Sequence, residues 1–224
     1  MVALVIGATG MVGSQLIRQL LADDRFEKIR LFSRRSLSIK NAKLEEHLID
    51  FNYPEQWKFM VRGDVLFSAL GTTLSKAGSK GAQFTIDYKY QYQFAKAASE
   101  NRVPHYILVS AAYASPSSKI FYSKMKGILE KDVKKLPFQN ITILKPGMLS
   151  GERKEKRAGE KIGIALFNIL HHLPGLKFLK PISAGYVAKA MINATMYHPQ
   201  NINVYSLGEV FTLAELNTVS GEIA

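Results

Sequence analysis

The amino-acid sequence predicts an α/β fold in which a doubly wound parallel sheet of about seven strands carries helices on both faces. Short apolar runs of strand length alternate along the chain with segments of helical periodicity, as in "VALVI" followed by "MVGSQLIRQLL". A glycine-rich turn stands between the first run and the first helical segment. This alternation favours βαβ units, and 224 residues are enough for one domain.

Each apolar run is assigned to a strand and each periodic segment to a helix. The first helix is typical of the set, because Val12, Leu16 and Leu20 form one apolar stripe. The expected strands are 2–6, 28–33, 44–51, 64–70, 105–110, 140–145 and 202–207. The expected helices are 11–24, 84–100, 120–135, 160–172 and 184–197, with a short one at the C-terminus. Residues 1–224 then form a single domain, with a small polar, basic lid insertion at 148–182.

Composition narrows the class of protein. Hydrophobic residues make up 47% and charged residues 21%, which is typical of a soluble globular protein. No apolar run approaches the roughly 18 residues that a membrane span needs, so no membrane is expected as a partner. The N-terminus lacks the basic region of a signal peptide and the chain has no cysteine, so the expected location is cytoplasmic. The five histidines lack metal-ligand spacing, and no metal is expected.

The chain is strongly basic, with a net charge of +12. The excess is concentrated in residues 119–161, which hold 12 Lys/Arg against 5 Asp/Glu. Such a stretch fits a solvated face, an anionic ligand or nucleic acid. Its lysines are not interleaved with stacking aromatics, and no nucleic-acid fold signature is present, so nucleic acid is not expected.

Three glycines in "VIGATGMVG" predict a phosphate-binding turn. Gly7 permits the sharp exit from the first strand, Gly10 lets the backbone approach a pyrophosphate, and Gly13 lets the helix pack closely on the sheet. The helix N-terminus adds free N–H groups and a positive dipole end. The other residues expected around this turn are Thr9, Met11 and Val12. A tight turn without a ligand is the alternative.

The end of the second strand indicates which dinucleotide would bind. An NAD site usually has an acidic residue about 20 positions beyond the glycines, on the ribose 2′-hydroxyl. Here Ser33 occupies that position and is followed by Arg34 and Arg35. A guanidinium binds a 2′-phosphate, so NADP is expected rather than NAD. The alternative is that both arginines are solvated loop residues.

The chain resembles the short-chain dehydrogenase/reductase superfamily. The glycine pattern, the single-domain length and a Y-x-x-x-K pair after the fifth strand carry the resemblance over essentially the whole chain. The stretches "DVLFSALGTT" and "IDYKYQYQFAKAA" look closest to atypical NAD(P)-binding members related to the Tat-interacting protein 2 oxidoreductases. The resemblance implies a Rossmann fold with strand order 3-2-1-4-5-6-7.

The resemblance also separates two pairs that share the same spacing. Tyr122 and Lys126 follow the fifth strand, where the family carries its catalytic tyrosine and lysine, whereas Tyr92 and Lys96 precede it. An unperturbed phenol has a pKa near 10, and a nearby ammonium favours the phenolate. The tyrosine can then exchange a proton with a carbonyl oxygen, while the lysine also bonds the nicotinamide ribose.

The family places a serine near the end of the fifth strand, to hold the substrate carbonyl. Ser110 is the candidate here, but Ala111 and Ala112 follow it where relatives have further serines. If the family serine aligns with an alanine, it is missing. Three serines of the next loop could then substitute for it; they are Ser115, Ser117 and Ser118.

Further residues match cofactor contacts of the family at strand ends. Those expected near the adenine and its ribose are Asp50, Phe51, Ala69, Leu70, Gly71 and Thr72, and those expected near the nicotinamide are Pro146, Gly147 and Met148.

The function that these expectations imply is an NADP-dependent oxidoreductase that acts on a carbonyl group of a small molecule. A catalytically weak NADP-binding regulatory or interaction protein is the alternative, which the doubtful serine motivates. The basic stretch leaves open an anionic group on the substrate, and pairing through helices in the family leaves open a homodimer.

Overall fold

The computed structural model describes residues 1–150 and 181–216. Seven parallel strands form the main sheet, in the order β3-β2-β1-β4-β5-β6-β9, so the expected topology is confirmed. They are β1 (Val2–Ile6), β2 (Lys28–Ser33), β3 (Leu44–Leu48), β4 (Val65–Ser68), β5 (His105–Val109), β6 (Asn140–Lys145) and β9 (Ile202–Ser206). The order reverses direction between β1 and β4, which is where ligands bind in sheets of this kind.

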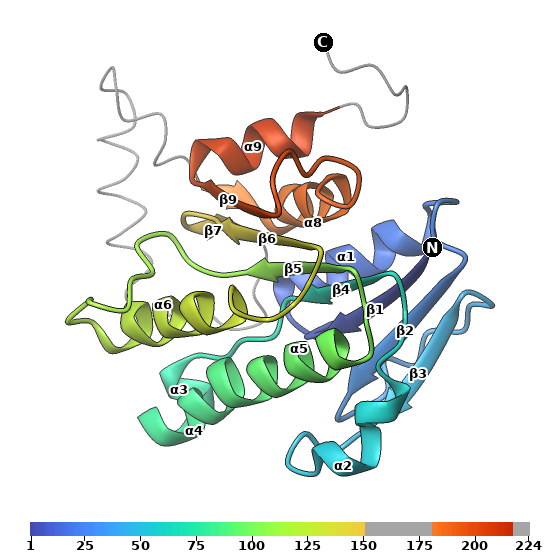
Figure 1. The fold of residues 1–224 in the computed structure, drawn as a ribbon, viewed down its shortest axis with the longest axis horizontal. Helices are drawn as coiled ribbons and strands as arrows, with labels where there is room; N and C mark the ends of the chain where they lie inside the picture. The colour runs from blue at the N-terminus through green and yellow to red at the C-terminus, as the bar shows by residue number, and fades with distance from the viewer. Residues whose placement is uncertain (151–180, 217–224) are drawn as a thin grey trace.

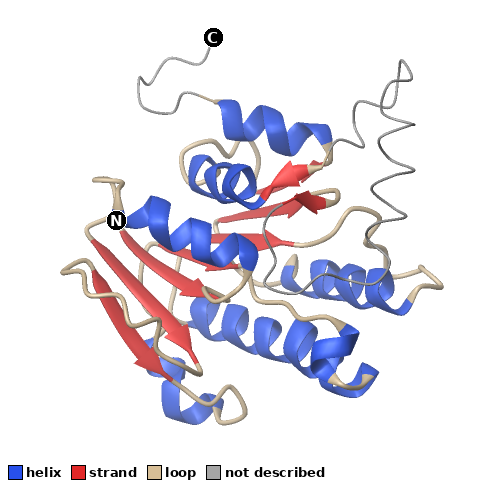
Figure 2. Ribbon diagram, turned by 180° about the vertical axis from the view of Figure 1, so that it is seen from behind, coloured by secondary structure: helices blue, strands red, loops and turns tan. Residues whose placement is uncertain are grey.

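Helices cover both faces of the sheet. In Figure 1, α8 (Ala184–Asn193) and α9 (Gly208–Glu215) lie above the strands, and α5 (Gln91–Glu100) and α6 (Phe121–Val133) lie below them. The helix α1 (Met11–Leu21) packs beside α8 and is seen in front of the strands in Figure 2. Successive side chains of β1 point to opposite faces of the sheet, so this strand contributes to the core on both faces. Ala3 and Val5 belong to the core under α1 and α8, while Leu4 and Ile6 belong to the core under α5.

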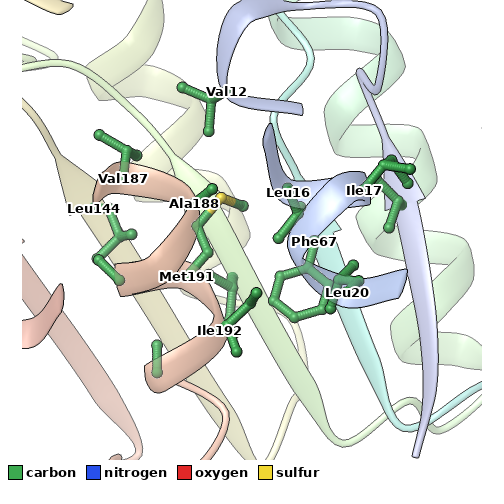
Figure 3. Packing of buried hydrophobic residues seen from close by; sticks show 14 of the residues in the cluster. Val12, Leu16, Ile17, Leu20, Phe67, Leu144, Val187, Ala188, Met191 and Ile192 are labelled. Carbon is green, nitrogen blue, oxygen red and sulfur yellow. The ribbon is translucent and has the colours of Figure 1, made fainter. Parts of the chain in front are cut away.

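The predicted stripe of α1 meets the matching stripe of α8. Figure 3 shows Leu16 and Leu20 on the side of α1 that faces Phe67 of β4 and Met191 of α8. All four side chains are fully buried. This contact holds the helix that follows the glycine turn firmly against the sheet, and so fixes the position of its N-terminus.

Some boundaries differ from those expected. The third strand stops at Leu48, and Asp50 instead opens a turn in which its Oδ1 accepts from the N–H of Asn52 at 2.9 Å. The fourth strand stops at Ser68. The remaining short elements are α2 (Pro54–Trp57), the 3₁₀ turn η1 (Lys58–Met60), α3 (Leu74–Ala77), β7 (Leu149–Ser150) and β8 (Ile182–Ser183). The expected helix 160–172 and most of the expected lid lie outside the described residues.

The helix expected at 84–100 begins earlier, at Lys80, and contains a π-helical stretch, whose turns are wider than those of an α-helix. It begins with α4 (Lys80–Phe84), where the Ser79 hydroxyl accepts from the N–H of Ala82 at 3.1 Å, and passes through the π-helical segment η2 (Thr85–Tyr90) into α5. A π segment inserts one extra residue per turn and is frequent at functional sites. Here it contains the buried Asp87.

No helix in the described ranges 1–150 and 181–216 combines the length and apolarity that crossing a membrane would require.

A close approach fixes α6 against the loop that follows β5. A Cβ on Gly127, in the middle of α6, would stand closer than 3.0 Å to the backbone of Ser115 and Pro116. The N–H of Ser115 also donates to the carbonyl of Ser123, one helical turn earlier, at 3.0 Å. The loop therefore lies directly on the helix backbone, and glycine is the residue that permits this.

We predict that Gly127→Ala lowers the free energy of unfolding by at least about 2 kcal/mol, because helix and loop must separate to admit the methyl group. Gly185→Ala in α8 is the matched control, since its Cβ would meet nothing closer than 3.8 Å, and it should stabilise by up to about 1 kcal/mol. Urea unfolding of both variants measures the difference. Equal stability of the two variants would contradict the close packing.

Candidate active site

Four loops meet at the carboxyl-terminal edge of the sheet, because all seven strands run in the same direction. They follow β1, β4, β5 and β6. Backbone hydrogen bonds join them in pairs: Ala69 N–H donates to the Ile6 carbonyl and Ala112 N–H to the Pro146 carbonyl, both at 3.0 Å. This edge holds most of the site residues expected from the sequence.

The glycine turn is tightly built. Gly7 has φ of +87°, and a Cβ on it would stand closer than 3.0 Å to the backbone of Ala69 and Leu70. A Cβ on Gly13 would come equally close to the Gly7 carbonyl. Gly10 is exposed, and a Cβ there would be 3.3 Å from the same carbonyl. Gly7 and Gly13 therefore serve the turn itself, while the surface at Gly10 stays open to a ligand.

The N-terminus of α1 is suited to an anion. Gly10 is its N-cap, has no side chain with which to cap the helix, and no acidic residue lies in the first turn. Its dipole and N–H groups therefore favour a phosphate. Thr9 is exposed beside it, whereas Val12 is buried and points toward α8 (Figure 3), so only the backbone of Val12 faces this end of the helix. The residues present fit a dinucleotide pyrophosphate.

The loop after β2 presents two unpaired arginines. Arg34 and Arg35 are exposed, and within the described ranges neither guanidinium has a hydrogen bond or an ion pair. Ser33 is buried, and its hydroxyl donates to the Arg35 carbonyl, so this side chain shapes the turn instead of facing a ribose. Glu46 of β3 holds the loop from the other side, accepting from the hydroxyl of Ser36 and from the N–H of Leu37.

The residues expected near the adenine lie just beyond β3 and β4. Phe51 is buried and stacks on Tyr90, with ring centroids 5.2 Å apart. It is therefore a core residue with little surface for a ligand. Asp50 is exposed. Along the β4 loop, Ala69, Leu70 and Thr72 are partly buried and Gly71 is exposed.

The Tyr122/Lys126 pair lies on one face of α6 at its N-terminal end. Tyr122 is 39% exposed, whereas Lys126 is only 3% exposed. The Lys126 Nζ lies 4.0 Å from the point where a Cβ of Gly71 would stand, so it reaches toward the β4 loop. No acceptor in the described residues bonds this Nζ, and it is not one of the fully buried atoms that lack a partner, so it keeps some exposure. An ammonium with no acceptor in the described part of the chain is available to a ligand.

Tyr92 and Lys96, the competing pair, lie on α5. Lys96 forms an exposed ion pair with Glu100 at 3.7 Å, and Tyr92 stacks on Tyr88. Both side chains are thus engaged with neighbours on their own helical segment.

Ser110 is buried, and its hydroxyl donates to Glu130 Oε1 of α6. The other oxygen of Glu130 accepts from Lys145 Nζ at 3.2 Å, and Lys145 Nζ also donates to the Ala114 carbonyl at 2.9 Å. The hydroxyl of Ser110 thus has a partner inside the protein, and its role in holding a substrate stays a prediction. The network braces β5, β6, α6 and the intervening loop.

The other loop serines and the β6 loop complete this edge. The hydroxyls of Ser115 and Ser117 bond each other at 2.9 Å, and the Ser118 hydroxyl accepts from the N–H of Ile120 at 3.1 Å. Pro146 is buried and Gly147 is half-buried. Met148 is exposed, and its carbonyl accepts from the Ile182 N–H at 2.9 Å.

Asp87, Glu130 and Lys145 are buried or largely buried polar residues that sequence reasoning did not select. Asp87 Oδ1 accepts from the N–H of Thr72 at 2.7 Å. Burial raises the pKa of Asp87, and the positive charge of Lys126 works against that rise. A charged residue on the apolar face of a predicted helix was the available signal for Asp87 and Glu130.

In the ranges 1–150 and 181–216, no three His, Cys, Asp or Glu residues gather as a metal site would require.

Comparison with known proteins identifies the family. A family described as NAD(P)H-binding matches residues 7–164. The protein FMP52, mitochondrial, of Candida albicans is 38% identical over 197 residues, which cover 84% of this chain and 85% of that protein. The protein of the same name from Saccharomyces cerevisiae is 36% identical over 158 residues, 69% of this chain and 68% of that protein.

Solved structures share the fold. The UDP-glucose 4-epimerase of Thermus thermophilus, in complex with NAD, superposes with a TM-score of 0.69 at 17% identity, covering 96% of this chain and 83% of that one. The enzyme WbmH of Bordetella bronchiseptica, in complex with NAD+, gives a TM-score of 0.68 at 12% identity, covering 92% and 74%. At these identities the likeness shows the fold alone.

The relatives correct one expectation. FMP52 proteins of several fungi, at 32–38% identity, are named mitochondrial, so the cytoplasmic location inferred from the sequence is wrong. The physical reason is that the cysteine count reports on redox chemistry, and does not separate one reducing compartment from another.

The glycine turn, the N-terminus of α1 and the match over residues 7–164 agree: the chain belongs to an NAD(P)H-binding family, is related to the fungal FMP52 proteins, and has a Rossmann-like α/β fold.

Proposed function

We propose that this protein is an NADP-dependent oxidoreductase that reduces a carbonyl group on a small molecule. One observation carries the proposal: the Lys126 side chain is 3% exposed, no described residue bonds its Nζ, and it lies one helical turn from the half-exposed Tyr122, beside the loop that follows β4. An ammonium one helical turn from a phenol can assist proton transfer. An NAD(P)H-binding domain supplies the setting in which such a pair acts on a carbonyl.

The cofactor would lie along the carboxyl-terminal edge of the sheet. The turn at Gly7 and Gly10 would hold the pyrophosphate, Arg34 and Arg35 the 2′-phosphate, and Lys126 the hydroxyls of the nicotinamide ribose. The pyrophosphate part rests on the uncapped N-terminus of α1, and the NADP preference on two exposed guanidiniums with no partner in the described residues. When bound, NADPH supplies a hydride.

Tyr122 would donate the proton that a reduced carbonyl oxygen requires. After that transfer the Lys126 ammonium, one helical turn away, would offset the negative charge left on the Tyr122 oxygen, because opposite charges in a partly buried site attract strongly. Gly127 supports this geometry, since it lets α6 lie directly on the substrate-side loop. The exposed Lys119 and Lys124 near the start of α6 are consistent with an anionic group on the substrate.

A second candidate is an NADP-binding protein with little catalysis of its own. The observation that favours it is the engagement of Ser110 by Glu130, which leaves Ala111 and Ala112 where relatives carry serines. Tight NADPH binding with no turnover across a broad panel of carbonyl compounds would favour this candidate.

We also propose that the protein resides in mitochondria, as its fungal relatives are named. Separation of purified mitochondria from cytosol in cells that express the protein measures this. Recovery of the protein in the cytosolic fraction alone would rule the proposal out.

We predict that Tyr122→Phe lowers NADPH-dependent turnover by about 10²–10⁴-fold, because the proton donor is lost, while the affinity for NADPH changes little. Tyr92→Phe is the matched control. It should keep full activity, since Tyr92 lies on α5, away from the α6 pair, and packs against Tyr88 of the same continuous helix. Steady-state kinetics and NADPH fluorescence titration measure both variants. Full activity of Tyr122→Phe would refute the mechanism.

We predict that the double variant Arg34→Ala/Arg35→Ala binds NADPH about 10–100-fold more weakly and leaves NADH binding unchanged, because charge-assisted bonds to the 2′-phosphate are worth about 1.5–3 kcal/mol. Lys40→Ala removes a charge from the same exposed loop and serves as the control. Calorimetric titration with each cofactor provides the measurement. An equal loss of affinity for NADPH and NADH would show that the arginines do not bind the 2′-phosphate.

A further inference from the structure

Asp87 is a fully buried carboxylate at the carboxyl-terminal edge of the sheet. It lies in the π-helical segment η2, and its Oδ1 accepts from the backbone N–H of Thr72 at 2.7 Å. Gln83 lies near its other oxygen, at 3.5 Å, and the Gln91 side chain donates to its carbonyl at 2.6 Å. Gln91 in turn accepts from the Ser68 hydroxyl at 2.8 Å, so Asp87 is anchored to the end of β4 by side chains as well as by backbone.

Asp87 and Lys126 flank the same glycine. A Cβ on Gly71 would stand 3.4 Å from Asp87 Oδ1 and 4.0 Å from Lys126 Nζ. The carboxylate comes from η2 and the ammonium from α6, two segments that pack against each other. The two charged groups therefore lie beside the same point of Gly71, in the loop that would pass along the cofactor, although no ion pair within 4.0 Å joins them in the described residues.

A charge on Asp87 or on Lys126 would destabilise the folded protein if the other charge were absent. Lys126 is 3% exposed and Asp87 is fully buried, and an isolated charge in such surroundings loses several kcal/mol of hydration. A carboxylate facing the ammonium offsets part of that loss for both groups. The influence is visible on the carboxylate side, where Lys126 opposes the rise in the pKa of Asp87 that burial causes.

We propose that Asp87 is a positioning residue for Lys126: bonded to the Thr72 amide, it holds the buried ammonium over Gly71, where the cofactor ribose and Tyr122 would meet it. The role in turnover rests on the proposed function, whereas the coupling of the two charges does not. The wider helical turn of η2 places Asp87 beside the β4 loop, between the buried polar side chains of Gln83 and Gln91 on the same helix.

A double-mutant cycle on stability tests the coupling without any substrate. Asp87→Asn keeps the shape and removes the charge, and Lys126→Met removes the ammonium at similar volume. Each single variant leaves one buried charge unopposed and should lower the urea midpoint by about 1 M, whereas the double variant should recover most of the loss. If the two single effects simply add in the double variant, the proposal is wrong.

The same cycle is then applied to function, with readouts that a general loss of stability would not produce. At saturating NADPH, Asp87→Asn should lower kcat at least about 10-fold with KM for the carbonyl substrate within about two-fold, because proton transfer suffers while the substrate pocket is intact. In the Lys126→Met background, Asp87→Asn should cause no further loss of NADPH affinity. A further loss there would show that Asp87 acts independently of Lys126.

Asp132→Asn is the matched control. Asp132 also lies on α6 and is paired, accepting from Tyr88 at 2.9 Å and from Lys135 at 2.8 Å, but it lies near the other end of the helix from Tyr122. It should leave kcat unchanged. Failure of Tyr122→Phe to affect turnover would overturn the oxidoreductase proposal and leave the charge coupling standing, so the two failures are distinguishable.

Discussion

The structure depends on one constraint: all seven strands of the main sheet run in the same direction. Every loop that follows a strand therefore emerges at one edge. The turn after β1, the loops after β4, β5 and β6, and the N-terminal ends of α1 and α6 are gathered there although they are far apart in the sequence. The strand order reverses between β1 and β4, and sheets of this kind bind ligands at the carboxyl-terminal edge beside such a reversal. A nucleotide-sized ligand can be held there by backbone and side chains together.

Two kinds of contact then fix the geometry of this edge. Glycines allow backbone to lie on backbone, as Gly7 does against the β4 loop and Gly127 against the β5 loop. Buried polar contacts fasten the same loops from behind, through Glu130 with Ser110 and Lys145, and through Asp87 with Thr72. Such networks are demanding, since every member must be satisfied, but they specify one arrangement of the elements they join. Lys126 is the exception, because its ammonium points to this edge without a hydrogen-bond acceptor in the described residues.

Local patterns predicted most of the fold. Apolar runs located all seven strands of the main sheet, because a strand that is buried on both faces consists of a short run of consecutive apolar residues. The glycine spacing located the turn before α1. Strand ends were less well predicted: the third strand stops at Leu48 because Asp50 bonds the next backbone amide and turns the chain. The π segment around Asp87 was not foreseen, since helical periodicity does not distinguish one widened turn from a regular helix.

The choice of Tyr122 and Lys126 over Tyr92 and Lys96 rests on position along the chain and stays a prediction. The direction of a side chain could not be predicted in this way, because it depends on tertiary partners: Ser110 turns to Glu130, Ser33 to the Arg35 carbonyl, and Val12 into the core. These partners lie on other elements or within turns whose shape the sequence alone does not give.

The most direct test of the central claim is a crystal structure of the protein with NADP+ bound. The account predicts the pyrophosphate at the N-terminus of α1 over Gly10, the 2′-phosphate in contact with Arg34 or Arg35, and the nicotinamide ribose within hydrogen-bonding distance of Lys126 Nζ. A cofactor whose nicotinamide end lies away from Lys126 and Tyr122 would contradict it.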